Sequence, residues 1–162
     1  MPYTAAILTT SDKGAAGERE DTSGAAIREL LESIGVEIAR YEVVPDERDT
    51  VAGRLRDWAD SGNVQLIVTT GGTGLGPRDV TPDATKTVLD YEVPGIAEAM
   101  RAEGLRHTPM SMISRAVSGV RNKTLIINLP GSPKGVRENL AVVLPVIQHA
   151  LDLLSGGGSE HT

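Results

Sequence analysis

The sequence of 162 residues contains no cysteine and no phenylalanine. Without cysteine the chain can form no disulfide, no thiolate metal site and no cysteine nucleophile. One tryptophan and three tyrosines supply its few aromatic rings, so we expect no platform for stacking nucleobases. The core must be built from Val, Ile, Leu and Ala, and a bound base would lie against backbone and aliphatic groups.

The sequence is also short of positive charge and of long apolar runs. Sixteen basic side chains stand against twenty-two acidic ones, for a net charge of −6, which argues against general nucleic-acid binding. No apolar run approaches the roughly 20 residues that span a bilayer, and no leader-like segment precedes the first apolar run. We expect a soluble cytoplasmic protein with no membrane partner. An anionic ligand would be held locally, by particular basic side chains, by helix N-termini or by a divalent ion.

The hydrophobic pattern predicts one domain over residues 1–154 and a flexible polar tail at 155–162. Short apolar runs predict strands, and apolar spacings of three and four predict helices. The predicted strands are 5–8, 36–44, 64–68, 117–120 and 124–129; the predicted helices are 23–34, 51 to near 62, 81–89, 96–100 and a final helix from 133. Strands that alternate with helices imply a single three-layer α/β/α domain with a mainly parallel sheet.

A glycine-rich connection follows the third predicted strand. It contains Gly71, Gly72, Gly74 and Gly76, and then Arg78 and Asp79. Glycine lets the backbone approach a ligand closely and turn through positive φ. The next residues predict a helix start, with Thr81 as N-cap and Pro82 at the first helical position. Because a helix N-terminus offers free N–H groups to an anion, the layout predicts a phosphate-bearing ligand.

Two common nucleotide-binding motifs are absent. A P-loop ends in Gly-Lys followed by Ser or Thr, and no such tripeptide occurs. The dinucleotide fingerprint G-x-G-x-x-G fails because its third glycine would fall on Pro77 or Asp79. The three histidines, His107, His149 and His161, show no paired ligand spacing. A plain surface loop is the simpler alternative for the glycine-rich connection.

Ligands of such sheets bind at the carboxyl ends of the strands. Four connections there carry unusual residues: 11–13, 45–47, the glycine-rich connection and 129–134. Three of them present carboxylates, from Asp12, Asp46 and Asp79, and two present phosphate cradles, at 71–76 and 131–134. Mg²⁺ prefers carboxylate and phosphate oxygens, and phosphoryl or nucleotidyl transfer depends mainly on positioning and charge neutralisation. The sequence therefore predicts chemistry on a phosphate.

These motifs resemble those of the molybdopterin adenylyltransferase family of molybdenum-cofactor biosynthesis, and those of the related G domains of plant and animal fusion proteins. The resemblance covers residues 4–150. It is carried by Thr-Thr-Gly-Gly-Thr-Gly from Thr69, Arg-Asp-Val-Thr-Pro-Asp-Ala-Thr from Arg78 and Leu-Pro-Gly-Ser-Pro-Lys from Leu129. Pro45-Asp46-Glu47 and Ser114-Arg115 fit as well.

The resemblance implies a molybdopterin-binding-like fold and a homo-oligomer, a trimer or alternatively a hexamer. It implies the reaction of Mg-ATP with molybdopterin to give adenylylated molybdopterin and pyrophosphate. It also implies hand-over of the product to a molybdotransferase.

The resemblance further implies roles for individual residues. Asp46 and Asp79 match catalytic carboxylates that act through Mg²⁺ and the phosphates. Asp12, Gly72 and Thr73 match positions on the nucleotide side, and Ser114, Gly131 and Ser132 match positions on the pterin and its terminal phosphate. Gly71, Gly74, Pro130 and Lys134 complete the predicted binding residues.

Other functions and roles fit the same residues. A molybdopterin-binding protein that performs no transfer is the alternative function, and a nucleotide-binding domain without a pterin is a third. Asp46 and Asp79 could cap helices, and Asp12 could form an Asx turn. The intact Arg-Asp-Val-Thr-Pro-Asp element favours the active enzyme.

Overall fold

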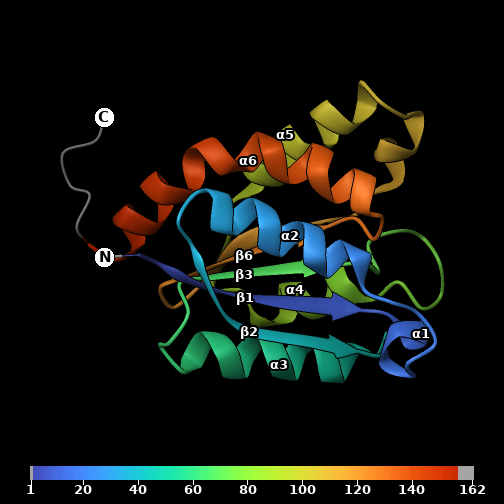
Figure 1. Ribbon diagram of the computed structural model, residues 1–162, viewed down its shortest axis with the longest axis horizontal. Helices are drawn as coiled ribbons and strands as arrows, with labels where there is room; N and C mark the ends of the chain where they lie inside the picture. Colours follow the sequence, from blue (N-terminus) through green and yellow to red (C-terminus); the bar gives the residue numbers. More distant parts are fainter. Residues whose placement is uncertain (1, 157–162) are drawn as a thin grey trace.

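The computed structural model describes residues 2–156, which form one six-stranded sheet with helices on both faces (Figure 1). The strands are β1 (Thr4–Thr10), β2 (Glu37–Val44), β3 (Leu66–Thr70), β4 (Tyr91–Glu92), β5 (Ser118–Arg121) and β6 (Thr124–Leu129). The helices are α1 (Asp12–Ala15), α2 (Thr22–Ser33), α3 (Arg48–Asp60), α4 (Thr81–Val88), α5 (Pro94–Leu105), the 3₁₀ helix η1 (Pro109–Ile113) and α6 (Pro133–Leu154). The predicted α/β class is confirmed.

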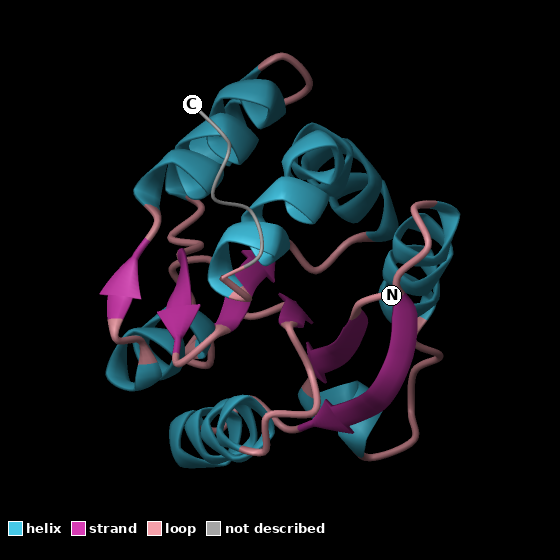
Figure 2. Ribbon diagram, turned by 90° about the vertical axis from the view of Figure 1, so that its left-hand side faces the viewer, coloured by secondary structure: helices cyan, strands magenta, loops and turns pink. Residues whose placement is uncertain are grey.

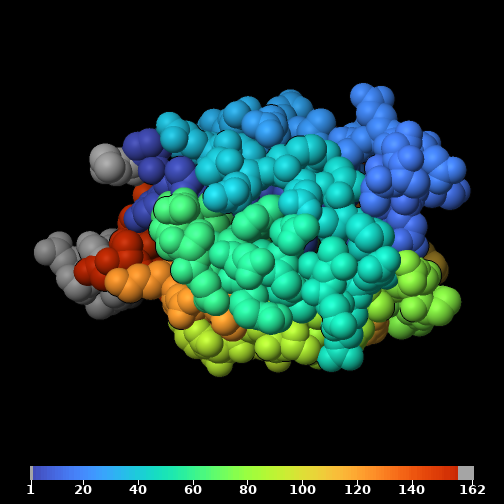
Figure 3. Space-filling view, turned by 90° about the horizontal axis from the view of Figure 1, so that it is seen from below, coloured from blue at the N-terminus to red at the C-terminus, as the bar shows by residue number. Residues whose placement is uncertain are grey.

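The strand order is β2-β1-β3-β6-β5-β4. β2, β1, β3 and β6 are parallel, whereas β5 and β4 are antiparallel to their neighbours. The carboxyl ends of the four parallel strands therefore meet at one edge of the sheet, on the right in Figure 1. In Figure 3 the segments near residues 11–21 (blue) and 72–80 (light green) project together at one end of the molecule.

Side chains of the sheet alternate between its two faces. On β1, Ala5 and Ile7 join the core cluster that includes α2, α5 and α6, whereas Ala6 and Leu8 join the cluster that includes α3 and α4. Figure 2 shows the sheet between these two helical layers. Because both faces are covered, the central strands consist almost wholly of apolar residues and Thr.

The start of α4 differs from the prediction that Thr81 is its N-cap. The helix already includes Thr81, and Val80 occupies the cap position without a side-chain hydrogen bond. Thr81 is completely buried, and its hydroxyl lies 3.0 Å from the Thr10 hydroxyl. Because the Thr81 hydroxyl is hydrogen-bonded to Thr10 on β1, it does not cap α4, so tertiary packing overrides the local capping pattern.

Two further details differ from the predicted elements. The helix predicted at 96–100 begins earlier, because α5 starts at Pro94 and proline is tolerated in a first helical turn. No helix was predicted between residues 11 and 21, but this connection contains α1, whose first turn Ser11 caps by accepting a hydrogen bond from the Gly14 amide at 3.0 Å.

The final helix follows the prediction at its start. Ser132 is the N-cap of α6 and accepts a hydrogen bond from the Gly135 amide at 3.0 Å, with Pro133 in the first turn. The helix ends at Leu154, and residues 157–162 of the predicted tail lie outside the described residues. Within residues 2–156 no helix is both long and apolar enough to cross a bilayer.

Candidate functional site

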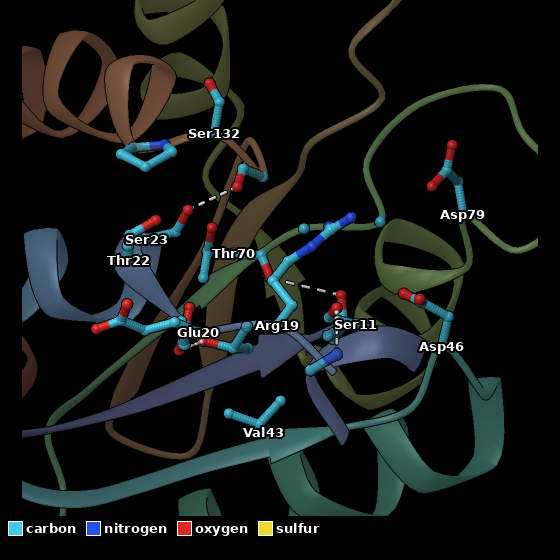
Figure 4. Close-up of a pocket in the computed structure, with 18 residues that line it drawn as sticks. Ser11, Arg19, Glu20, Thr22, Ser23, Val43, Asp46, Thr70, Asp79 and Ser132 are labelled. Atoms are coloured by element: carbon cyan, nitrogen blue, oxygen red, sulfur yellow. Dashed lines mark hydrogen bonds between the residues drawn. The ribbon is translucent and has the colours of Figure 1, made fainter. Parts of the chain in front are cut away.

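A cavity of about 490 Å³ lies at the carboxyl ends of β1, β2, β3 and β6 (Figure 4). Of the predicted site residues it brings together Asp46, Gly71, Gly72, Asp79, Gly131 and Ser132. Figure 4 shows Asp46 and Asp79 on the same side of this cavity, reached from the connections after β2 and β3. We call it the polar cavity, because nearly all of its lining residues are polar, charged or glycine.

The glycine-rich connection lies directly against the end of β1. Gly71 and Gly72 both have positive φ, 98° and 67°. A Cβ on Gly71 would lie 2.5 Å from the Thr10 carbonyl oxygen, and one on Gly72 would lie 2.5 Å from the Thr81 hydroxyl. Both the backbone angle and the space therefore require glycine at these two positions.

Asp46 is a half-buried carboxylate at the polar cavity. Its Oδ2 accepts a hydrogen bond from the Asp12 amide at 3.0 Å, and its own amide donates to Asp12 Oδ1 at 2.9 Å. Burial raises the pKa of Asp46, and the negative charges of Asp12 and Asp79 raise it further. Hydrogen bonds from the Asp12 backbone and from Thr10 lower the pKa, but by less. The site therefore holds Asp46 in its charged form at an energetic cost, which a bound cation would offset.

Asp12 is held by an arginine from the glycine-rich connection. Arg78 Nε and Nη2 donate to the two carboxylate oxygens at 3.0 and 2.9 Å. The hydrogen bond from Arg78 lowers the pKa of Asp12. Asp12 was predicted to line the nucleotide side, but it is not among the residues that line the polar cavity. It exchanges hydrogen bonds with Asp46, and its bond to Arg78 ties the glycine-rich connection to the end of β1.

Asp79 folds back into its own connection. Its Oδ2 accepts a hydrogen bond from the Gly76 amide at 2.9 Å. A Cβ on Gly74 or on Gly76 would lie 2.9 or 3.0 Å from that same oxygen, so both glycines leave room for the carboxylate. Asp79 does not cap α4, whose N-cap is Val80. It lines the polar cavity, and its charge contributes to the raised pKa of Asp46.

Arg115 braces the glycine-rich connection, a role that the sequence did not predict. Its guanidinium donates to the Gly74 carbonyl at 2.8 Å and to the Asp79 carbonyl at 2.7 Å. It also lies 3.2 Å from the Asp83 carboxylate and lowers the pKa of that group. No local pattern marks such a contact, because Arg115 and Asp79 are 36 residues apart.

The N-terminus of α2 forms the opposite wall of the polar cavity. Asp21 caps this helix through the Gly24 amide at 3.0 Å and also accepts hydrogen bonds from the Thr9 and Tyr41 hydroxyls. Ser23 donates to the Gly131 carbonyl at 2.6 Å and thereby joins α2 to the second phosphate cradle. Neither Asp21 nor Ser23 was predicted to belong to the site, although an Asp before a helical pattern is a capping signal.

A second cavity of about 350 Å³ adjoins the first and is lined largely by apolar groups of α5, η1 and α6. The remaining predicted binding residues line it: Thr73, Gly74, Ser114, Pro130 and Lys134. His107, for which the sequence predicted no role, also lines it and lies 2.9 Å from Glu103 and 3.3 Å from Glu138. Ser132 lines both cavities, so the N-terminus of α6 lies between them.

Comparisons with known proteins converge on one family. The family model described as "Probable molybdopterin binding domain" matches residues 6–149. A molybdopterin adenylyltransferase of Helicobacter pylori is 45% identical over 152 residues, which cover 93% of this chain and 86% of that protein. Gephyrin of Dictyostelium discoideum is 44% identical over 160 residues, which cover 92% of this chain but only 22% of gephyrin.

Solved structures agree with these sequence matches. The molybdopterin biosynthesis enzyme MoaB from Thermus thermophilus is 58% identical and superimposes with a TM-score of 0.90, covering 95% of this chain and 97% of that one. At this similarity the two chains share one fold over nearly their whole length.

The raised pKa of Asp46 leads to a stability prediction. Because the pKa of Asp46 is higher in the folded protein than in the unfolded chain, folding favours the protonated carboxyl. The stability that this shift contributes is present below the ordinary aspartate pKa of about 3.9, and it is lost as pH rises through the higher pKa of the folded protein. At pH 7 the replacement Asp46→Asn should therefore raise the melting temperature, by about 1–4 °C. Thermal unfolding of both proteins at pH 7 and again near pH 4 should show the gain shrinking in acid.

Asp46→Ala is the matched control for this experiment. It also removes the charge, but it leaves the Asp12 amide without its acceptor, so it should be less stable than Asp46→Asn at every pH. A lower melting temperature for Asp46→Asn than for the wild-type protein at pH 7 would contradict the charge argument.

Proposed function

The chain belongs to the molybdopterin-binding domain family, and we propose that it transfers the adenylyl group of ATP to molybdopterin in molybdenum-cofactor biosynthesis. It is a nucleotidyltransferase like the relatives named molybdopterin adenylyltransferase. One observation carries the proposal: two cavities of different character meet at Ser132. A transfer between two phosphate-bearing molecules needs both to be held side by side.

The two cavities suit the two substrates. The polar cavity, with the N-termini of α2 and α6 at its walls, suits the phosphates of ATP. The second cavity has apolar walls and Lys134 near its boundary with the first. Such walls suit the flat pterin ring, and the lysine suits its terminal phosphate.

The reaction follows from this arrangement. An oxygen of the molybdopterin phosphate attacks the α-phosphorus of ATP, a new phosphorus–oxygen bond forms, and the bond to pyrophosphate breaks. The 130–132 segment lies where the two phosphates would meet. Its backbone and Ser132 orient the reacting groups.

We propose that Asp46 and Asp79 hold Mg²⁺ together with the phosphates. Residues 2–156 contain no group of three acidic or histidine side chains that could hold a metal by themselves. Mg²⁺ commonly binds through one or two carboxylates plus substrate phosphates and water, and the two carboxylates that line the polar cavity fit that donor set. When bound, the ion would neutralise charge on the phosphates.

We further propose a closed homotrimer, with a hexamer as the larger alternative. An apolar groove of about 290 Å³ between α5 and α6 is lined by Val93, Gly95, Ile96, Ala99, Val142, Val143 and Val146. It lies next to the edge strand β4, whose Tyr91 is 54% exposed. A second copy of the chain would cover both features, and closed symmetry is the usual arrangement of identical chains.

The product is chemically activated, and we propose that it passes in the cytoplasm, where ATP is abundant, to a molybdotransferase. The match to 22% of gephyrin supports the hand-over, because there the same kind of domain shares one chain with other segments. The overall test is incubation with molybdopterin, ATP and Mg²⁺, followed by mass spectrometry. Adenylylated product supports the enzyme, and pterin binding without product supports a binding protein.

Asp79→Asn should abolish most transfer while leaving the fold intact. The amide can still accept from Gly76 but lacks the charge that a metal needs, so adenylylation should fall by about a hundredfold or more. Molybdopterin affinity should change by no more than a few-fold, since Asp79 lines only the polar cavity. Asp49→Asn removes an equal charge from an exposed position on α3 and should turn over normally. Normal turnover by Asp79→Asn would exclude its proposed role.

Lys134→Ala should weaken molybdopterin binding by about ten- to a hundredfold, the size expected for a charge-assisted phosphate contact. ATP affinity should stay within a few-fold, because Lys134 lines only the second cavity. Calorimetric titration of both ligands checks this. Arg137→Ala, which removes a cation paired with Glu29 on the outside of α6, is the control. Equal loss for both ligands would mean that the cavities are wrongly assigned.

Light scattering at micromolar concentration tests the trimer. We expect a mass of three chains, and replacement of Val146 in the groove by Glu should shift the protein toward monomers, because a charge would be buried at the interface. A stable wild-type monomer would contradict the proposal.

A further inference from the structure

The polar cavity has an unbalanced charge for a site that binds ATP. Its charged side chains are one cation, Arg19, and four carboxylates, Glu20, Asp21, Asp46 and Asp79. ATP would add several further negative charges, and like charges at close range repel strongly where water is scarce. A divalent ion offsets only part of this charge, so a cationic side chain in contact with the phosphates has a clear physical role.

The arginines of the neighbouring connections already have carboxylate partners. Arg78 is bound to Asp12, and Arg115 is bound to Asp83. Lys134 lines the second cavity rather than the first. Within the described part of the chain Arg19 makes no ion pair. Figure 4 shows its side chain extending over the middle of the polar cavity.

The segment that carries Arg19 connects α1 to α2 and is fastened on both sides. On one side Gly17 turns through a φ of 77°, and the Glu18 amide donates to the Lys13 carbonyl at 2.8 Å. On the other side Asp21 caps α2 and accepts hydroxyl hydrogen bonds from Thr9 and Tyr41. These contacts fix the backbone on both sides of Arg19, so its side chain reaches the cavity from a defined position.

We propose that Arg19 is a binding residue for the phosphate chain of ATP. The inference rests on the proposed function, and it names a group that neither the glycine-rich connection nor the two carboxylates supply. A guanidinium presents paired N–H donors that match two phosphate oxygens, and it stays charged at any working pH. Arg19 extends over the middle of the polar cavity, and its charge turns an acidic cavity into one that accepts a polyanion.

Calorimetric titration with adenosine, AMP and ATP, each with Mg²⁺, tests the proposal. For Arg19→Ala we expect the affinity for ATP to fall by about ten- to a hundredfold, while that for adenosine stays within twofold. The point in the series at which the loss begins identifies the phosphate that Arg19 contacts. Arg19→Lys should recover part of the affinity, because lysine keeps the charge but not the paired donors.

Two controls separate this effect from a change of net charge. Lys123→Ala removes one positive charge at the β5–β6 turn, at the opposite end of β6 from the cavity, and should leave ATP binding unchanged. Glu20→Gln removes a negative charge from the same cavity and should strengthen ATP binding. Since Arg19 is exposed, the melting temperature of Arg19→Ala should match that of the wild-type protein.

The proposal is overturned if Arg19→Ala binds ATP as the wild-type protein does, or if it loses adenosine and ATP affinity equally. Its failure is distinct from failure of the proposed function. If the wild-type protein forms adenylylated product while Arg19→Ala binds ATP normally, the proposed function stands and the role of Arg19 is wrong. If the wild-type protein forms no product but its ATP affinity depends on Arg19, the role of Arg19 in ATP binding stands and the proposed function is wrong.

Discussion

The whole site depends on one steric constraint, the absence of side chains where β3 ends. Gly71 and Gly72 press their backbone against the end of β1 so closely that a Cβ would meet the Thr10 carbonyl or the Thr81 hydroxyl. Gly131 adjoins this contact on the other side, where a Cβ would lie 3.4 Å from the Gly71 Cα, an ordinary contact distance. Because three strand ends can approach one another in this way, carboxylates from separate connections reach a single cavity.

Beneath this contact lies a buried polar network rather than apolar packing. Asn128 on β6 donates to the hydroxyls of Thr69 and Thr85 at 3.0 and 3.1 Å, and Thr85 donates to the Thr81 carbonyl at 2.7 Å. No buried side-chain N or O atom of the described residues lacks a partner. A fully satisfied network in a low dielectric is stiff, so the floor of the site holds the start of α4 in one place before any ligand arrives.

The sequence predicted the parts of this architecture that have local signals. Apolar runs marked the central strands, and Ser132 before Pro133 marked the start of α6. It did not predict contacts between distant segments. The Arg78–Asp12 pair spans 66 residues, and Thr81, which looks like a helix cap, is instead held by Thr10. β4 was missed because two residues are too few to show a period, and resemblance to a family rather than spacing brought Ser114 into the site.

The single tryptophan occupies an unusual position with respect to this chemistry. Trp58 belongs to the last turn of α3 and packs into the core, whereas the site lies at the first turn of that helix, roughly 15 Å away along its axis. Its fluorescence therefore reports the integrity of the α3–α4 layer and is insensitive to events at the phosphates. The protein carries a built-in optical probe of folding that is separate from catalysis, so loss of structure and loss of chemistry can be followed in the same cuvette.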